Sequence, residues 1–256
     1  MPKPKPPHDK SIWISGINPA RAALLSDRST LQELIVSRTD KRTSELVELG
    51  IARGLPVRHA ERQVLSGLVG HPHHQGVALR GSDFPYLSID ELLAKTSEEL
   101  EPLVILDCLQ DPQNLGAILR SACFLGAKHV VIPKDRAAQV TGAVIKVAAG
   151  ATSYLPVVRV TNLAVTLDHL KERGLWVVGL DVEGDKGLFE ADLSAPLALL
   201  VGSEQKGIRP LLRKGCDMLL RIPQSGPLQS LNAATAAAIA LAEVQRQRMQ
   251  WQVSRK

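Results

Sequence analysis

The sequence is poor in aromatic residues and in cysteine, and it has no long apolar run. Phe, Trp and Tyr make up 3% of the 256 residues, which argues against an RNA-binding surface built on stacked aromatic rings. The three cysteines, Cys108, Cys123 and Cys216, form no CxxC pair, so neither a zinc ribbon nor a disulfide framework is indicated. No stretch approaches the roughly 20 apolar residues of a membrane span. We therefore expect a cytoplasmic protein with reduced thiols and no contact with the membrane.

Several enzyme signatures are also missing. The sequence has no GxGxxG after a predicted strand, no GxxxxGK[ST], no HExxH and no GxSxG. Standard dinucleotide-binding, P-loop, zinc-protease and serine-hydrolase sites are therefore not supported. Beyond residue 100 the only histidines are His129 and His169, both inside predicted secondary structure. Catalysis based on histidine is not expected there.

Three histidines lie close together in the run HPHHQG, at positions 71, 73 and 74. They lack neighbouring cysteine or carboxylate ligands, and Pro72 favours a turn. The sequence therefore predicts a solvated loop here and no metal site in the protein.

What the sequence does contain is an excess of positive charge, unevenly distributed. Its 31 Lys and Arg exceed its 26 Asp and Glu, for a net charge of +5. Such a basic protein often binds a polyanion, although solubility explains the charge equally well. Residues 81–100 are the exception, with five acidic residues and one lysine, and are predicted to be an acidic linker. Residues 1–10, with four prolines and three lysines, are predicted to be a disordered tail.

The hydrophobic pattern predicts an α/β fold with two domains. Residues 11–80 alternate short strands and helices, in just enough length for a core of their own. From residue 101 onward, continuous apolar strands alternate with helices, and an Ala-rich helix runs from about 231 to 249. This arrangement is typical of a mostly parallel sheet covered on both faces.

The first of three notable polar segments is DPQNLG, residues 111–116, at the end of a predicted strand. A helix start explains Asp111 as the cap and Pro112 as the first helical residue. It does not explain Asn114, which is not a strong helix former. It also leaves Arg120 unexplained, because an arginine on an otherwise apolar helix requires an anionic partner.

The second segment is GSEQKG, residues 202–207, after another apolar strand. Its two glycines allow the backbone to approach a ligand closely, and Glu204 is a candidate partner for Arg120. The alternative is a tight surface turn.

The third segment runs from Ile222 to Asn232, and Ser230 is predicted to cap the last helix. The small residues 233–238 permit close helix packing, either at a subunit interface or within one chain. All three segments follow strands, where open α/β sheets bind ligands. Their mixture of amides, one carboxylate and one guanidinium suits a heteroaromatic ligand together with a substrate that carries phosphate.

The stretches DPQNLGAILR, LLVGSEQKG and IPQSGPLQSLNAA resemble the three ordered motifs of the SpoU/TrmH family of RNA ribose 2′-O-methyltransferases. Residues 101–256 carry this resemblance. Residues 11–80, ending in HQGVALR, are similar to the ribosomal-protein-like RNA-binding domain of the RlmB-type 23S rRNA guanosine methyltransferases. The resemblance implies a SPOUT α/β domain with a C-terminal trefoil knot, S-adenosylmethionine as the cofactor and an obligate homodimer. It implies methylation of a ribose 2′-hydroxyl in RNA, with a guanosine of 23S rRNA as the expected target.

The resemblance also implies roles for individual residues. The catalytic positions of the family fall on Asn114, Arg120, Glu204, Ser230 and Asn232, and the cofactor-binding positions fall on Gly202, Ile222 and Leu231. We expect Arg120 to act electrostatically on the substrate, because a guanidinium group keeps its proton in proteins, which disfavours a role as the base. Two residues depart from the family pattern, Gln205 and Ala234, and the second could alter the cofactor pocket.

Two alternatives remain open at this stage: a tRNA ribose 2′-O-methyltransferase, and a non-catalytic ribosome-assembly factor that binds RNA and retains the fold. The presence of all the implied catalytic residue types argues against the second. The separate N-terminal domain favours a large structured RNA over tRNA.

Overall fold

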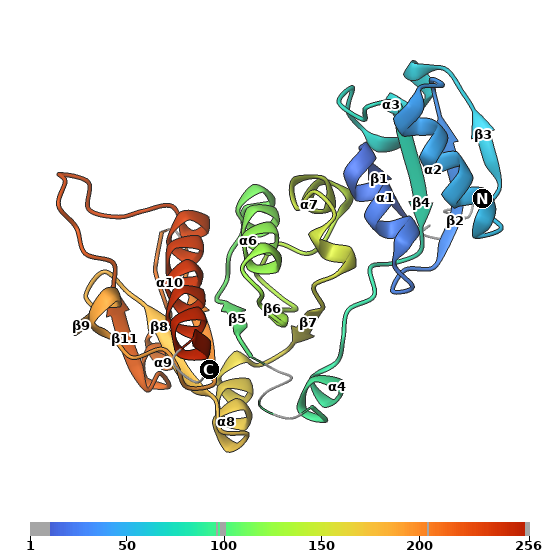
Figure 1. Cartoon of the computed structure of the whole chain (residues 1–256). Coiled ribbons are helices and arrows are strands. Elements are labelled where there is room, and N and C mark those ends of the chain that lie inside the picture. The colour runs from blue at the N-terminus through green and yellow to red at the C-terminus, as the bar shows by residue number, and fades with distance from the viewer. Residues whose placement is uncertain (1–10, 96, 98–100, 204, 254–256) are drawn as a thin grey trace, which may run out of the picture. The chain divides into compact units, whose positions relative to one another are not determined.

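The computed structural model describes residues 11–95, 97, 101–203 and 205–253, without the side chains of 251–253. The predicted tail, residues 1–10, lies outside this part of the chain. The structure separates into two compact units (Figure 1). The first comprises Met1–Pro85 and Val140–Tyr154, and the second comprises Tyr86–Gln139 and Leu155–Lys256.

A four-stranded sheet in the order β1-β4-β2-β3 forms the centre of the first unit. Strand β4 is antiparallel to both of its neighbours, whereas β3 runs parallel to β2. The core is aliphatic: Leu34, Leu46, Leu65 and Leu79 are fully buried. The elements are β1 (Ile12–Ser15), α1 (Ile17–Leu25), β2 (Leu31–Val36), α2 (Lys41–Ala52), β3 (Val57–His59), α3 (Arg62–Val69), β4 (Val77–Gly81), α7 (Gly142–Val147) and the 3₁₀ turn η1 (Ala151–Ser153).

Two elements of the first unit, α7 and η1, come from residues 140–154, which lie in the sequence between strands β6 and β7 of the second unit. Residues 140–154 contact β1 and α1, and the Ser26 hydroxyl donates a hydrogen bond to the Ser153 carbonyl at 2.9 Å. The sequence pattern alone did not assign this segment to the first unit.

A seven-stranded sheet in the order β7-β6-β5-β10-β8-β11-β9 forms the second unit, and every neighbouring pair is parallel. All residues of β5, β6 and β10 are buried, as the continuous apolar runs predicted. The elements are α4 (Ile89–Leu93), β5 (Leu103–Leu106), α6 (Pro112–Phe124), β6 (His129–Pro133), β7 (Val157–Val160), α8 (Leu163–Glu172), β8 (Trp176–Leu180), β9 (Lys186–Gly187), the 3₁₀ turn η2 (Leu188–Glu190), β10 (Leu197–Val201), α9 (Pro210–Lys214), β11 (Met218–Arg221) and α10 (Ala233–Val253).

The strand order brings distant parts of the sequence together at the centre of this sheet. Strand β10 lies between β5 and β8, so the ends of β5 and β10 meet at one edge. Helix α10 packs against α6, with Ala233, Ala237 and Ala240 buried. The small residues of α10 thus serve packing within the chain. Within the described residues, no helix is long and apolar enough to cross a membrane.

Candidate active site

Helix α6 positions the first polar segment as the sequence predicted. The Asp111 carboxylate accepts a hydrogen bond from the main-chain N–H of Gln113 at 2.9 Å, and Pro112 is the first helical residue. Asn114 therefore lies in the first turn, half-buried, and Arg120 lies further along the helix with its side chain exposed.

Asn232 joins the first segment to the third. Its Nδ2 donates to Asn114 Oδ1 at 2.9 Å, while its Oδ1 accepts from the main-chain N–H groups of Ala234 at 2.9 Å and Thr235 at 3.3 Å. The prediction that Ser230 caps the last helix is therefore wrong. Helix α10 begins at Ala233, two residues later than predicted, so Asn232 occupies the capping position and Ser230 lies on the exposed loop before it.

The second polar segment folds into a tight turn after β10. The main chains of Ser203 and Gly207 exchange two hydrogen bonds, of 3.1 and 2.9 Å. A Cβ atom on Gly202 would lie 2.1 Å from the Gly207 carbonyl carbon, so only glycine fits at this position. The predicted pairing of Arg120 with Glu204 stays a prediction, because Glu204 lies outside the described residues.

The loop between β11 and α10 is largely exposed to solvent. Ile222 is half-buried, while Leu228 and Leu231 are 75% and 46% exposed. Leucines in a loop that also offers main-chain amides suit a ligand with both an apolar ring and polar groups. Of the residues that the sequence singled out for a cofactor, Ile222 and Leu231 thus offer accessible apolar surface for the ring of such a ligand.

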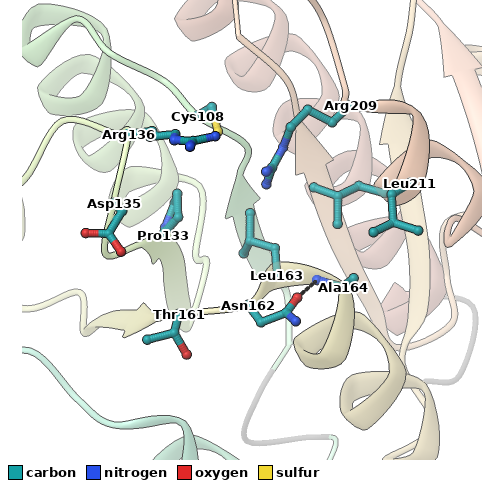
Figure 2. A pocket seen from close by; sticks show the side chains of 11 residues that line it. Cys108, Pro133, Asp135, Arg136, Thr161, Asn162, Leu163, Ala164, Arg209 and Leu211 are labelled. Carbon is teal, nitrogen blue, oxygen red and sulfur yellow. Dashed lines mark hydrogen bonds between the residues drawn. The ribbon is translucent and has the colours of Figure 1, made fainter.

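A cleft of about 500 Å³ opens at the carboxyl ends of β5, β6 and β7 (Figure 2). Arg209 enters from the side of α9, and its Nε donates to Asp107 Oδ1 at 2.7 Å while its main-chain N–H donates to Asp107 Oδ2 at 2.9 Å. Asp107 is fully buried. Arg136 lines the opposite side. Sequence reasoning missed these three residues, although a carboxylate directly after an apolar strand was a usable signal.

None of the cysteines is activated as a nucleophile. Burial raises the pKa of the Cys108 and Cys123 thiols and raises the pKa of Cys216 to about 11. All three therefore remain protonated at neutral pH, so the site does not suit chemistry that begins with a thiolate.

The histidine run in the first unit differs in part from its prediction. His74 is fully buried; its Nδ1 accepts from the Gly76 main-chain N–H at 3.1 Å, and its Nε2 lies 3.2 Å from the Ser66 hydroxyl. His74 is thus a structural residue and not part of a solvated loop. Among the described residues, no group of His, Cys, Asp or Glu is arranged to hold a metal ion.

The same turn helps to form a second, basic pocket of about 260 Å³ in the first unit. Three arginines and one histidine contribute to its wall, and the lining includes no acidic residue. The complete lining is Ile17, Ser37, Arg38, Arg42, Arg62, His73, Gln75 and Gly76. Arg38 is already paired with Asp40 at 2.8 Å, so Arg42 and Arg62 are the cations of this pocket that suit a phosphate group.

Family models match both parts of the chain. The SpoU rRNA Methylase family matches residues 101–242, and the RNA 2′-O ribose methyltransferase substrate binding model matches residues 13–87. The chain belongs to the SpoU rRNA methylase family, as its three motifs predicted, and its parallel α/β unit has the fold of SPOUT methyltransferases.

Relatives of known name are similar over nearly the whole chain. The 23S rRNA (guanosine-2′-O-)-methyltransferase RlmB of Shewanella oneidensis is 42% identical over 244 residues, covering 93% of this chain and 98% of that protein. The SpoU methyltransferase AviRb from Streptomyces viridochromogenes, solved with the cofactor AdoMet, superposes with a TM-score of 0.81 at 27% identity, covering 94% of this chain and 92% of the other. An AdoMet-bound rRNA methyltransferase from Sinorhizobium meliloti gives 0.79 at 26% identity, covering 93% and 87%.

Proposed function

We propose that the protein transfers a methyl group from S-adenosylmethionine to the 2′-hydroxyl of a guanosine in 23S rRNA, in the cytoplasm. The observation that carries this proposal is the Asn114–Asn232 hydrogen bond, which joins the first and third motifs of the family at one edge of the sheet. The name of the Shewanella relative supports the choice of RNA and nucleoside.

The cofactor-binding role falls on the turn after β10 and the loop after β11. Main-chain groups near Gly202, Ile222 and Leu231 would hold S-adenosylmethionine, which supplies an electrophilic methyl group when bound. The remaining task of the protein is to align the ribose oxygen with that methyl group. Arg120 would bind a substrate phosphate and favour the ionised 2′-oxygen electrostatically. Asn114 and Glu204 would orient Arg120, and Ser230 and Asn232 would shape the pocket around the ribose and the methionine.

The Asn232 amide both caps α10 and donates a hydrogen bond to Asn114. A substitution that separates these two contacts tests whether the contact with Asn114 positions the catalytic groups. Asn232→Asp keeps the oxygen that caps α10 but loses the donor to Asn114. We expect the thermal unfolding midpoint to stay close to that of the wild type while kcat falls at least about tenfold. Asn232→Ala, which also loses the cap, should in addition lower the free energy of unfolding by about 1 kcal/mol. An Asn232→Asp variant with normal kcat would show that this hydrogen bond does not serve catalysis.

The basic pocket of the first unit supports RNA binding by residues 11–80. We expect Arg42→Gln to weaken RNA binding about tenfold, because an arginine–phosphate contact is charge-assisted. The dependence of log K on log salt should become shallower by about one unit, as one fewer phosphate is neutralised. Fluorescence anisotropy with an rRNA fragment measures both effects.

Arg58→Gln is the matched control, since it removes the same charge from the same unit. Arg58 pairs with Glu33 at 2.8 Å and does not line the pocket. If both variants weaken binding equally, the pocket has no special role and the unit attracts RNA through its overall charge.

The same proposal includes the arrangement of the chain. We infer that residues 11–80 select the RNA and that residues 101–256, apart from residues 140–154, form the catalytic domain with a trefoil knot. The segment predicted as an acidic linker, residues 81–100, contains helix α4, whose Leu92 is fully buried in the core of the second unit, so we infer that only its first residues connect the two units. We also infer a homodimer, supported by Phe124 at the end of α6, which is 89% exposed and would be buried by a second subunit. Light scattering should give twice the mass of the chain, and a monomer would contradict the dimer.

Mapping of 2′-O-methylation tests the choice of substrate. In a strain that lacks the protein, primer extension along 23S rRNA should lose one stop at a guanosine, and the wild-type gene should restore it. An unchanged 23S pattern together with a lost ribose methyl group in tRNA would instead favour the tRNA enzyme.

A further inference from the structure

The cleft at the carboxyl ends of β5, β6 and β7 is lined by both polar and apolar residues from several elements. Its wall combines Arg209 and Arg136 with apolar surface from Pro133, Leu163 and Leu211. Leu211 is 69% exposed, so apolar surface is accessible at the mouth of the cleft. Cationic groups beside apolar surface match a nucleotide, which has a charged phosphate and an uncharged ring.

The backbone around the cleft adopts conformations that L-residues rarely take. Cys108 and Arg136, which both line it, have φ angles of 54° and 57°. Such left-handed residues are uncommon outside glycine and are concentrated at ligand-binding sites. Two of them on one cleft indicate that the local conformation is maintained to direct these side chains.

Asp107 fixes the orientation of Arg209. Both of its carboxylate oxygens are engaged, one by the Nε and the other by the main-chain N–H of Arg209. The hydrogen bond from the guanidinium to Asp107 uses its Nε, and the side chain remains 48% exposed. A guanidinium held in this way loses less conformational entropy when it binds an anion than a free arginine does.

The one acidic residue in the lining of the cleft, Asp135, does not occupy the place where an anion would bind Arg209. Arg136 and Arg209 enter from opposite sides, and the Asp135 carboxylate points away from Arg209 (Figure 2). Asn162 uses its Oδ1 to cap α8 by accepting from the Ala164 N–H at 3.0 Å, so its amide nitrogen remains as a further donor. The cleft therefore presents hydrogen-bond donors next to an apolar wall.

We propose that this cleft binds one nucleotide of the RNA substrate, with its phosphate on Arg209 and Arg136 and its base against Leu211 and Leu163. This inference rests on the proposed function and adds a substrate subsite to it. Arg209 and Arg136 are binding residues, and Asp107 is a positioning residue that acts through Arg209. The cleft lies at the same edge of the sheet as the motif segments, because Asp107 follows β5 and Arg209 follows the turn after β10.

Steady-state kinetics with purified full-length protein and an rRNA fragment tests the subsite. We expect Arg209→Gln and Arg136→Gln each to raise KM for RNA about tenfold, with KM for S-adenosylmethionine unchanged, since each variant removes a charge-assisted contact with phosphate. The matched control is Arg213→Gln in helix α9, which begins directly after Arg209. Arg213 pairs with Glu183 at 3.0 Å and does not line the cleft, so this variant should keep KM for RNA within about twofold.

A second pair of variants tests the positioning role. Asp107→Asn should raise KM for RNA like Arg209→Gln, and the double variant should be no worse than either single one, because both act on the same contact. Thermal unfolding and calorimetric titration with S-adenosylmethionine identify a variant that has simply failed to fold. If Asp107→Asn fails to fold, Arg209→Lys provides the test. Lysine keeps the positive charge but lacks the planar set of donors of the guanidinium. The variant should therefore recover only part of the affinity for RNA.

The outcomes separate this inference from the function on which it rests. Unchanged KM for RNA in both Arg209→Gln and Arg136→Gln, with an active wild type, overturns the subsite and leaves the proposed function standing. A wild-type protein that transfers no methyl group to any RNA overturns the proposed function itself. Additive effects of Asp107→Asn and Arg209→Gln would overturn the positioning role.

Discussion

Replacement of Arg120 by alanine is expected to lower kcat for methyl transfer by about 10² to 10³-fold. The guanidinium would be lost from the place where the 2′-oxygen develops negative charge, and no other group in the first motif supplies a cation there. Because Arg120 is exposed on the surface of α6, the truncation leaves no cavity, and the unfolding midpoint should remain unchanged. Transfer of a radiolabelled methyl group to an rRNA fragment measures the rate.

Binding of S-adenosylmethionine should survive this substitution, as calorimetry would show, since the cofactor is assigned to main-chain groups elsewhere. Lys128→Ala provides a control, because Lys128 is another exposed cation, four residues beyond the end of α6, and its loss should leave kcat unaltered. Normal turnover in Arg120→Ala would refute the role of this residue.

Gly202→Ala is expected to impair both stability and cofactor binding. The added Cβ would lie 2.1 Å from the carbonyl carbon of Gly207 and 2.4 Å from the main-chain nitrogen of Ile208. Backbone on both sides of this contact has to move, at a cost of about 3 kcal/mol in the free energy of unfolding. The unfolding midpoint should fall by about 6 to 12 °C, and the heat of S-adenosylmethionine binding should disappear because the turn after β10 is displaced.

Gly67→Ala is the matched control for this substitution. Gly67 lies inside helix α3, and nothing lies within 4 Å of the position that its Cβ would occupy. Alanine should therefore stabilise the helix by about 0.5 to 1 kcal/mol and leave cofactor binding intact. A Gly202→Ala protein that binds S-adenosylmethionine like the wild type would contradict the assignment of this turn.

The local features of the fold were predictable because they depend on neighbouring residues. The capping aspartate and Pro112 set the start of α6, and the continuous apolar runs became the fully buried strands β5, β6 and β10. The start of α10 was missed by two residues, since Ser230 and Asn232 are both good caps and the local sequence does not choose between them. What distinguishes Asn232 as the cap is its hydrogen bond to Asn114, a partner 118 residues away in the sequence.

The long-range features needed the structure. Strand β9 has only two residues, Lys186 and Gly187, and carries no apolar pattern to reveal it. The position of β10 between β5 and β8 depends on pairing between distant segments, which hydrophobic periodicity does not encode. The cleft lined by Arg136 and Arg209, with the buried Asp107 holding Arg209, arises from this strand order, and for that reason the motifs alone did not reveal it.

The most direct measurement is the identity of the nucleoside that the purified protein produces. Protein, unmodified 23S rRNA and S-adenosylmethionine are incubated together, and the RNA is digested and analysed by mass spectrometry. The account predicts one equivalent of 2′-O-methylguanosine per rRNA, and none with Arg120→Ala. A methyl group on a base, or RNA that remains unmodified, would contradict it.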